Sequence, residues 1–301
     1  ILRDHYAIKK MPPDRFHRER YFNPEIGAYG KSYCELGGLI DEVPFDTKYF
    51  RIPPKVLAST DIAQLWALQV ALETIIDAGR TPEDLKGHHC GVFIGHARGS
   101  MLTSDMAFST AVEGIIEQAK RLENCPSSIH RHEATVVDQI HGHYPKRTED
   151  GGTGTIASAL AGRITSTFEW TGPHMVIDAA CASSFAALDM AARAIRSGRL
   201  PMALVGGASY SQELSVILFA QSRALSPNGT YPFDRRADGF ISSDGVGFLL
   251  IMPLEKAIAE GYSVKAVIQG IGGSCDGKGK ALWAPRKEGQ VLAMQRAYQE
   301  A

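Results

Sequence analysis

Residues 175–197 read MVIDAACASSFAALDMAARAIRS, and the character of the chain changes twice within this stretch. An apolar, partly β-branched run stops at Asp178, small residues surround Cys181, and a helix-forming stretch begins at once. This order predicts a buried strand, a tight turn and a helix. Apolar residues recur in the helix at three- and four-residue steps, which predicts that they share one face. They are Phe185, Leu188, Ala192 and Ile195.

Cys181 is predicted to lie at the N-terminus of that helix. Free backbone N–H groups and the positive end of the helix dipole favour a thiolate there. The flanking residues, Ala180 and Ala182, are small enough to leave the sulfur accessible. A free cysteine is also a common small core residue. Spacing alone therefore supports both a catalytic and a packing role for Cys181.

Strands and helices alternate on both sides of this segment. We predict further strands at 91–95, 202–206, 247–252 and 264–271. We predict helices at 62–78, with Asp61 as N-cap and Gly79 at the end, and at 156–164, 184–197, 213–221, 254–260 and from about 288. Such alternation predicts an α/β fold with a mostly buried sheet. Residues 1–60 show little periodicity, which predicts irregular structure.

Residues 97–155 interrupt the regular order. They contain a predicted helical stretch at 111–122 and then a polar tract with the two pairs His130/His132 and His141/His143. Together with Cys125 these histidines raise the question of a zinc site. The surrounding sequence is polar and has no H-x-x-x-H pattern on a helix. We therefore expect a solvated surface insertion that holds no metal.

Composition excludes several classes of protein. The 301 residues carry a net charge of −1, so the total charge gives no basis for non-specific binding to nucleic acid or anionic lipid. Five widely spaced cysteines form no C-x-x-C pair, which argues against a disulfide framework or a zinc ribbon. No apolar run is long enough to span a bilayer, and no secretory signal is evident. A cytoplasmic protein is the expectation.

Several segments, taken together, resemble the β-ketoacyl synthases, the condensing enzymes of fatty-acid and polyketide synthesis. They are DAACASS (178–184), LVGGAS (204–209), PFDRRADGF (232–240) and APRKEGQ (284–290). The nearest group is the ketosynthases of iterative type I polyketide synthases and of polyunsaturated fatty acid and enediyne synthases. The resemblance implies the thiolase-like α/β fold, layered αβαβα. It implies a ketosynthase domain over 1–301, with a nearly complete N-terminal half (1–285), an insertion around 97–155, and the start of a truncated C-terminal half (286–301).

By the same resemblance, Cys181 is the nucleophile of a decarboxylative Claisen condensation. It takes an acyl chain from the phosphopantetheine of an acyl carrier protein, and malonyl carrier protein then loses carbon dioxide and attacks the thioester. The backbone N–H of Cys181 is expected to be one oxyanion donor. No tightly bound cofactor is expected, because phosphopantetheine arrives on the carrier protein. The family's two catalytic histidines lie in motifs that this sequence lacks, so we expect them beyond Ala301 and expect no condensation by this chain alone.

The resemblance also implies roles for other residues. His174, seven positions before Cys181, is expected to pack or to pair at an interface. We expect Asp234, Arg235 and Asp238 to make buried ion pairs, and Asp244 to serve a structural network.

Partners follow from the family as well. We expect a homodimer formed through the strand at 174–177, neighbouring domains of a multidomain synthase, acyl and malonyl thioester substrates, and no nucleic acid. Two other functions stay open. One is a non-catalytic ketosynthase-like partner that dimerises or sets chain length, although such partners usually lack the nucleophilic cysteine. The other is a thiolase-type acyltransferase that uses no carrier protein.

Overall fold

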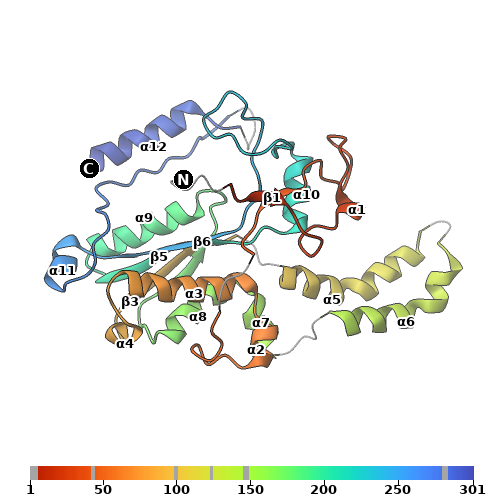
Figure 1. Ribbon diagram of the computed structural model, residues 1–301, viewed down its shortest axis with the longest axis horizontal. Coiled ribbons are helices and arrows are strands. Elements are labelled where there is room, and N and C mark those ends of the chain that lie inside the picture. The colour runs from red at the N-terminus through yellow and green to blue at the C-terminus, as the bar shows by residue number, and fades with distance from the viewer. Residues whose placement is uncertain (1–5, 42–44, 98–100, 123–124, 145–148, 280–283) are drawn as a thin grey trace. The chain divides into compact units, whose positions relative to one another are not determined.

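A computed structural model of the protein describes residues 6–41, 45–97, 101–122, 125–144, 149–279 and 284–301 (Figure 1). The chain divides into two compact units. Unit 1 comprises residues 1–70, 96–164 and 207–247, and unit 2 comprises residues 71–95, 165–206 and 248–301. Each unit is described by itself below.

A four-stranded sheet supplies most of the regular structure around Cys181. Its strands are β3 (Cys90–Gly95), β4 (His174–Ile177), β5 (Met202–Ser209) and β6 (Gly245–Ile251), in the order β4-β3-β5-β6. Strands β3 and β4 are parallel, and Gly95 is in register with Ile177. All four correspond to predicted strands. β3 is buried along its whole length, as expected for a strand inside an α/β layer.

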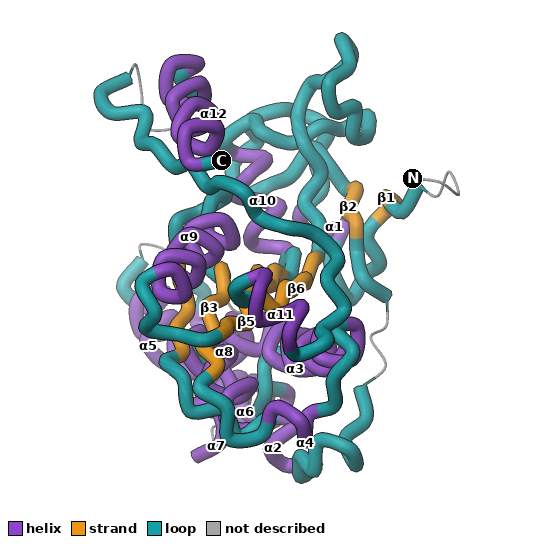
Figure 2. Tube along the Cα trace, turned by 90° about the vertical axis from the view of Figure 1, so that its left-hand side faces the viewer, coloured by secondary structure: helices purple, strands orange, loops and turns teal. Residues whose placement is uncertain are grey.

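Helix α9 (Ser183–Arg196) packs on this sheet against β3 and β4 (Figures 1 and 2). Its buried stripe consists of Ala187, Ala191 and Ala194, which meet Phe93 and Val205 of the sheet. The predicted packing face was partly wrong, because Phe185 is 71% exposed. Small alanine side chains let the helix approach the strands closely, and the larger residues lie beside or away from the contact.

The other long helices follow the predicted periodicity. They are α3 (Ile62–Asp77), α8 (Ala157–Thr167), α10 (Glu213–Gln221), α11 (Leu254–Ala259) and α12 (Lys287–Glu300). Asp61 caps α3 as predicted, since its carboxylate accepts the N–H of Ala63 at 2.9 Å. Gly79 follows the helix with a φ of +77°. Within the described residues, no helix is long and apolar enough to cross a bilayer.

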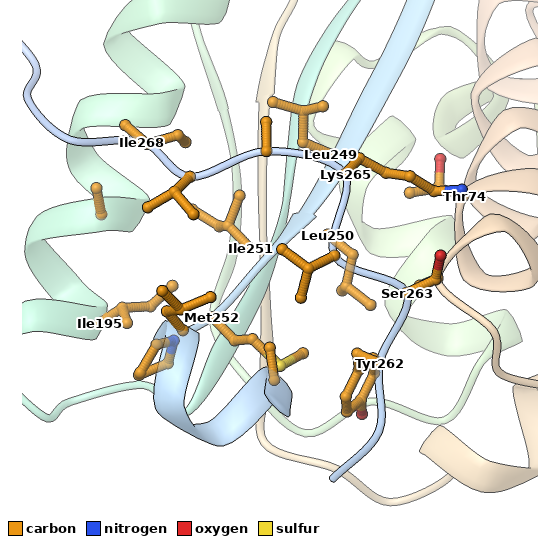
Figure 3. Close-up of a pocket in the computed structure, with 18 of the residues that line it drawn as sticks. Thr74, Ile195, Leu249, Leu250, Ile251, Met252, Tyr262, Ser263, Lys265 and Ile268 are labelled. Carbon is orange, nitrogen blue, oxygen red and sulfur yellow. The ribbon is translucent and has the colours of Figure 1, made fainter. Parts of the chain in front are cut away.

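The predicted strand at 264–271 is wrong. These residues run from α11 to α12 without entering a sheet (Figure 2). The end of the segment contacts α12 instead, where the N–H of Ile271 donates to Glu300 Oε2 at 2.9 Å. An apolar cavity of about 600 Å³ separates residues 262–268 from β6, and Figure 3 shows Leu250, Ile251 and Met252 along it. The contacts with α12 hold the end of segment 264–271 away from the sheet. The β-branched residues of this segment therefore do not form a strand.

Unit 1 has its own apolar core, which includes Phe16, Tyr33, Val216, Leu225 and Ile241. The described part of the first 60 residues is mostly irregular, as predicted. It contains the short elements β1 (Ile8–Lys10), α1 (Arg18–Tyr21), β2 (Leu36–Gly38) and α2 (Pro54–Ala58), and β1 pairs antiparallel with β2. A further short helix in unit 2, α4 (Pro82–Leu85), is closed by a capping box between Thr81 and Asp84.

Residues 97–155 are more helical than predicted. They form α5 (Met101–Lys120), α6 (Ser127–His143) and α7 (Glu149–Thr155), while 98–100, 123–124 and 145–148 lie outside the described residues. Helices α5 and α6 pack side by side, with a Phe108–Tyr144 ring contact at 5.6 Å. Lys120 also forms an ion pair with Glu133. Helix α6 has no buried residue, which agrees with the solvated surface expected for the polar tract, and it is helical where no helix was predicted.

Candidate functional site

Cys181 lies on a sharp turn between β4 and α9. The strand ends at Ile177, the helix begins at Ser183, and residues 178–182 are all exposed. The predicted strand, turn and helix are therefore confirmed around this residue. The side chain of Cys181 is exposed, so the cysteine is not a core residue.

Two side chains hold the turn in shape. Asp178 Oδ1 accepts the N–H of Ala180 at 3.0 Å. Ser183 Oγ accepts the N–H of Ala179 at 2.9 Å and donates to the carbonyl oxygen of Ala180 at 2.6 Å. Ala180 itself has a φ of +50°. The left-handed region costs a non-glycine residue about 1–2 kcal/mol, so the turn persists only because its surroundings enforce it.

Gly95, the last residue of β3, forms the floor under the turn. A Cβ at this position would lie 2.5 Å from the carbonyl carbon of Ser183 and 2.8 Å from Ser184 Cα. Real side chains do not approach backbone so closely. Glycine at position 95 therefore lets the end of β3 contact the first turn of α9 directly. This contact sets how close the turn that carries Cys181 lies to the sheet.

His174 does not reach the turn through any hydrogen bond of the described residues. It is the first residue of β4 and is exposed, and its Nδ1 lies 3.3 Å from Thr165 Oγ1. This partner agrees with the expected packing role. The strand β4 stands at one end of the sheet order, and its second edge is free within the described residues.

Two other histidines make local hydrogen bonds to backbone carbonyls. His141 Nε2 lies 3.1 Å from the carbonyl oxygen of Ser109, to which it must donate because a carbonyl only accepts. His96 Nδ1 is buried and donates to the carbonyl oxygen of Ala208 at 2.8 Å. In the described part of the chain, no three potential metal ligands gather into a group.

The expected buried ion pairs of the PFDRRADGF segment are not present in that form. Asp234, Arg235 and Asp238 are all exposed, so the prediction of burial was wrong. Asp234 pairs with Arg236 at 3.0 Å, and this guanidinium lowers the pKa of Asp234. Asp238 accepts Asn228 Nδ2 at 2.7 Å. These bonds shape an exposed turn, because side chains only two to ten residues apart can meet without a core around them.

Asp244 does belong to a buried network. Its carboxylate accepts Arg15 Nη2 at 2.8 Å, the N–H of Ser211 at 2.7 Å and the N–H of Ile40 at 3.0 Å. The guanidinium of Arg15 also lies 4.0 Å from the ring centre of Tyr210. The predicted structural role of Asp244 agrees with these contacts. The partner Arg15 was missed, since nothing in the sequence around position 15 marks it.

The cavity beside β6 does not contain the cysteine. Its walls come from α9, β6, the end of α3 and residues 262–268, and Cys181 is not among them (Figure 3). Its polar rim includes the ion pair between Lys265 and Asp77 at 3.0 Å. The turn that carries Cys181 therefore lies at an exposed surface of unit 2 and not in this cavity.

A mixed α/β sheet that presents a cysteine on a strand-to-helix turn is the arrangement of a condensing enzyme with a thiolase-like fold. The chain belongs to the β-ketoacyl synthase family, because the family model described as "Beta-ketoacyl synthase, N-terminal domain" matches residues 1–257. Members of this family are condensing enzymes. The family and the fold predicted from the motifs are confirmed.

Two curated relatives are polyketide synthases. The pikromycin polyketide synthase component PikAII of Streptomyces venezuelae is 31% identical over 299 residues, which cover 98% of this chain and 7% of PikAII. Erythronolide synthase EryA2 of Saccharopolyspora erythraea is 32% identical over 291 residues, covering 95% of this chain and 7% of EryA2. The chain thus corresponds to a small part of each synthase.

A solved structure gives the same result for the fold. The ketosynthase from module 6 of the bacillaene synthase of Bacillus subtilis 168 superposes with a TM-score of 0.74 at 25% identity. The match covers 99% of this chain and 44% of that chain. The assignment to an iterative type of synthase stays a prediction.

Proposed function

We propose that this chain acts in a polyketide-type synthase as the part of a ketosynthase that accepts the growing acyl chain on Cys181. The observation that carries the proposal is the exposed cysteine on a strained turn at the N-terminal end of α9, within a chain of the β-ketoacyl synthase family. The same observation favours an enzyme over a non-catalytic partner, because a partner that only dimerises has no need of an accessible thiol.

The acyl transfer needs few groups. The thiolate of Cys181 attacks the carbonyl carbon of an acyl thioester on the phosphopantetheine of an acyl carrier protein. The carbonyl electrons move to oxygen, and the backbone N–H of Cys181 is one donor to this oxyanion. The intermediate collapses, the bond to the phosphopantetheine sulfur breaks, and that sulfur leaves as a thiolate that takes up a proton. The product is a thioester on Cys181, which suits both steps because sulfur is a good nucleophile and a good leaving group.

In the family, condensation follows from the same intermediate and uses two histidines whose motifs this sequence lacks. Malonyl carrier protein loses carbon dioxide, and the electron pair of the broken carbon–carbon bond becomes a carbanion next to the thioester carbonyl. This carbanion attacks the acyl carbon on Cys181, and the Cys181 sulfur leaves as a thiolate. The product is a β-ketoacyl chain on the carrier protein, and Cys181 returns to its starting state.

The open edge of β4 supports the proposal that two copies associate through this strand. His174 and Val176 lie on it, and it has no neighbour on one side among the described residues. An unpaired strand edge is a ready template for another strand. We therefore propose a second copy of the chain as one partner. The other proposed partners follow from the family: an acyl carrier protein, acyl and malonyl thioesters, and neighbouring domains of a synthase.

Intact mass spectrometry tests the central step. The chain is incubated with an acyl carrier protein that carries an acyl group, and with the same acyl group on free coenzyme A. We expect one acyl adduct, formed faster from the carrier protein, and its loss in Cys181→Ala. Cys275→Ala is the matched control, since Cys275 is the other exposed cysteine of unit 2. An adduct that persists in Cys181→Ala, or no adduct on the unaltered chain, would contradict the proposal, and faster acylation by coenzyme A would favour a thiolase-type reaction.

A further inference from the structure

Ser183 has an unusual position for a serine in the first turn of a helix. It is only 7% exposed, and its hydroxyl makes two hydrogen bonds to the turn that precedes it. The N–H of Ala179 donates to Oγ at 2.9 Å, and Oγ donates to the carbonyl oxygen of Ala180 at 2.6 Å. The hydroxyl thus bridges backbone groups on both sides of the strained residue Ala180. Cys181 lies between the residues that this bridge joins.

We infer that Ser183 is a positioning residue for Cys181, an inference that rests on the proposed role of Cys181 as the acyl acceptor. The φ of Ala180 is +50°, a conformation that alanine leaves readily when nothing holds it. Asp178 also holds Ala180 through its N–H, but this bond is exposed to water. The bonds of Ser183 are partly buried, because the Ser183 side chain is only 7% exposed, and hydrogen bonds cost more to lose as their burial increases.

The direction of the thiol depends on this bridge. Cys181 is exposed, so packing around its side chain does little to hold it, and its position is set by the backbone of the turn. Relaxation of Ala180 to a negative φ would rotate the following peptide and move the sulfur away from the N-terminal end of α9. Ser183 acts only through this backbone. Its hydroxyl touches neither the sulfur nor, in this proposal, the substrate.

The test compares three variants by two reactions of the thiol. Ser183→Ala removes the bridge, and Ser183→Thr keeps a hydroxyl at the same position. Ser197→Ala is the matched control, because Ser197 Oγ donates to the carbonyl oxygen of Ala194, three residues earlier, at the opposite end of α9. Alkylation by iodoacetamide is followed at Cys181 by peptide mass spectrometry, with Cys275 as an internal reference. Acylation by an acyl pantetheine thioester is followed in parallel.

We expect Ser183→Ala to lower the rate constants of both reactions at Cys181 by about tenfold, since small displacements of a reacting group have effects of this order. Ser183→Thr is expected to restore most of the rate, and Ser197→Ala to leave it unchanged. A purely structural role would lower the melting temperature without changing alkylation of the folded protein. Alkylation of folded Ser183→Ala at the unaltered rate would therefore overturn the inference.

Two further results separate the possible failures. If Ser183→Ala does not fold, hydrogen exchange of the Ala179 amide in the unaltered protein decides the matter, because protection is expected and exchange at the free rate would overturn the bridge. If alkylation slows in Ser183→Ala while the unaltered chain is never acylated, the proposed function fails and the positioning of the thiol stands. The two ideas are thus tested independently.

Discussion

At the scale of single residues, the carboxylate of Asp244 joins three distant parts of unit 1, and one substitution can remove its charge. Its side chain is fully buried and faces Arg15, whose side chain is 10% exposed. Asp244→Asn keeps the shape but leaves the guanidinium without its counter-charge. Breaking a buried pair in this way costs about 3–5 kcal/mol, so we expect a loss of unfolding free energy of that order. Urea denaturation measures it.

The control for Asp244 is an exposed ion pair of the same unit. Lys9 and Asp41 lie 2.6 Å apart, and their side chains are 48% and 70% exposed. Exposed pairs contribute about 0–1 kcal/mol, so Asp41→Asn should change the unfolding free energy little. Equal effects of the two variants would show that the Asp244 network does not hold unit 1 together.

The candidate nucleophile Cys181 could be predicted from the sequence around it. The residues that hold its turn in place could not. Small residues between an apolar run and a helical stretch mark Cys181 directly in the sequence. Gly95 and Ser183 acquire their roles only when β3 and β4 lie side by side, and this pairing joins distant parts of the chain. Arg15 and Asp244 are 229 residues apart, and no local pattern announces such a pair.

At the scale of elements, Glu35 links two short pieces of unit 1. Its carboxylate lies 2.5 Å from Lys10 Nζ of β1 and 2.6 Å from Arg18 Nε of α1. The bond from Lys10, and then that from Arg18, holds the pKa of Glu35 below its ordinary value of 4.5. A depressed carboxyl pKa stabilises the fold above the unfolded value and loses this contribution as the pH falls through the folded value.

Thermal unfolding of Glu35→Gln tests this link. We expect the variant to melt below the unaltered protein at pH 6–7, by an amount equivalent to about 0.5 kcal/mol, because the partner side chains are exposed. The difference should shrink as the pH falls below 4.5, because Glu35 is then protonated first in the unfolded chain and, at lower pH, in the folded protein. A difference that is constant from pH 7 to pH 3 would rule out the charge as its cause.

Helix α12 depends on a glycine in the segment before it. A Cβ at Gly272 would lie 2.5 Å from the backbone nitrogen of Ala297, whereas a Cβ at Gly273 would meet nothing within 4 Å. We expect Gly272→Ala to displace α12 and to speed the exchange of its amide hydrogens by at least about tenfold, which is a loss of about 1.4 kcal/mol of local stability. Gly273→Ala is the adjacent control. Equal exchange in both variants would contradict the close contact.

The same contact explains the main error at the element scale. Val264, Val267 and Ile268 are typical of a strand, yet backbone contacts of Gly270 and Gly272 with α12 decide where the segment runs. The opposite error concerns α6, whose polar, histidine-rich sequence lacks a strong apolar period. Its helix is stabilised by contacts with α5 that only the folded structure provides.

At the scale of the whole molecule, the free edge of β4 predicts that two copies of the chain pair through this strand. Val92 N–H donates to the carbonyl oxygen of Pro173 at 2.9 Å, and Val92 is in register with His174. In a parallel ladder alternate residues bond the neighbouring strand, so the N–H groups of His174 and Val176 face the free edge. A second copy of β4 would accept or donate hydrogen bonds at these positions.

Light scattering after size exclusion tests the proposed dimer. At micromolar concentration we expect twice the chain's mass of 32.7 kDa. Val176→Pro removes one donor from the free edge and leaves the bonds to β3 in place, so it should weaken association by about tenfold or more. Val176→Ala, which keeps the N–H and shortens the side chain, separates the loss of the donor from the loss of apolar contact. If the unaltered chain is a monomer, this edge is not the interface. The same conclusion follows if Val176→Pro and Val176→Ala dimerise equally strongly, because strand pairing depends on the backbone donor that only proline removes.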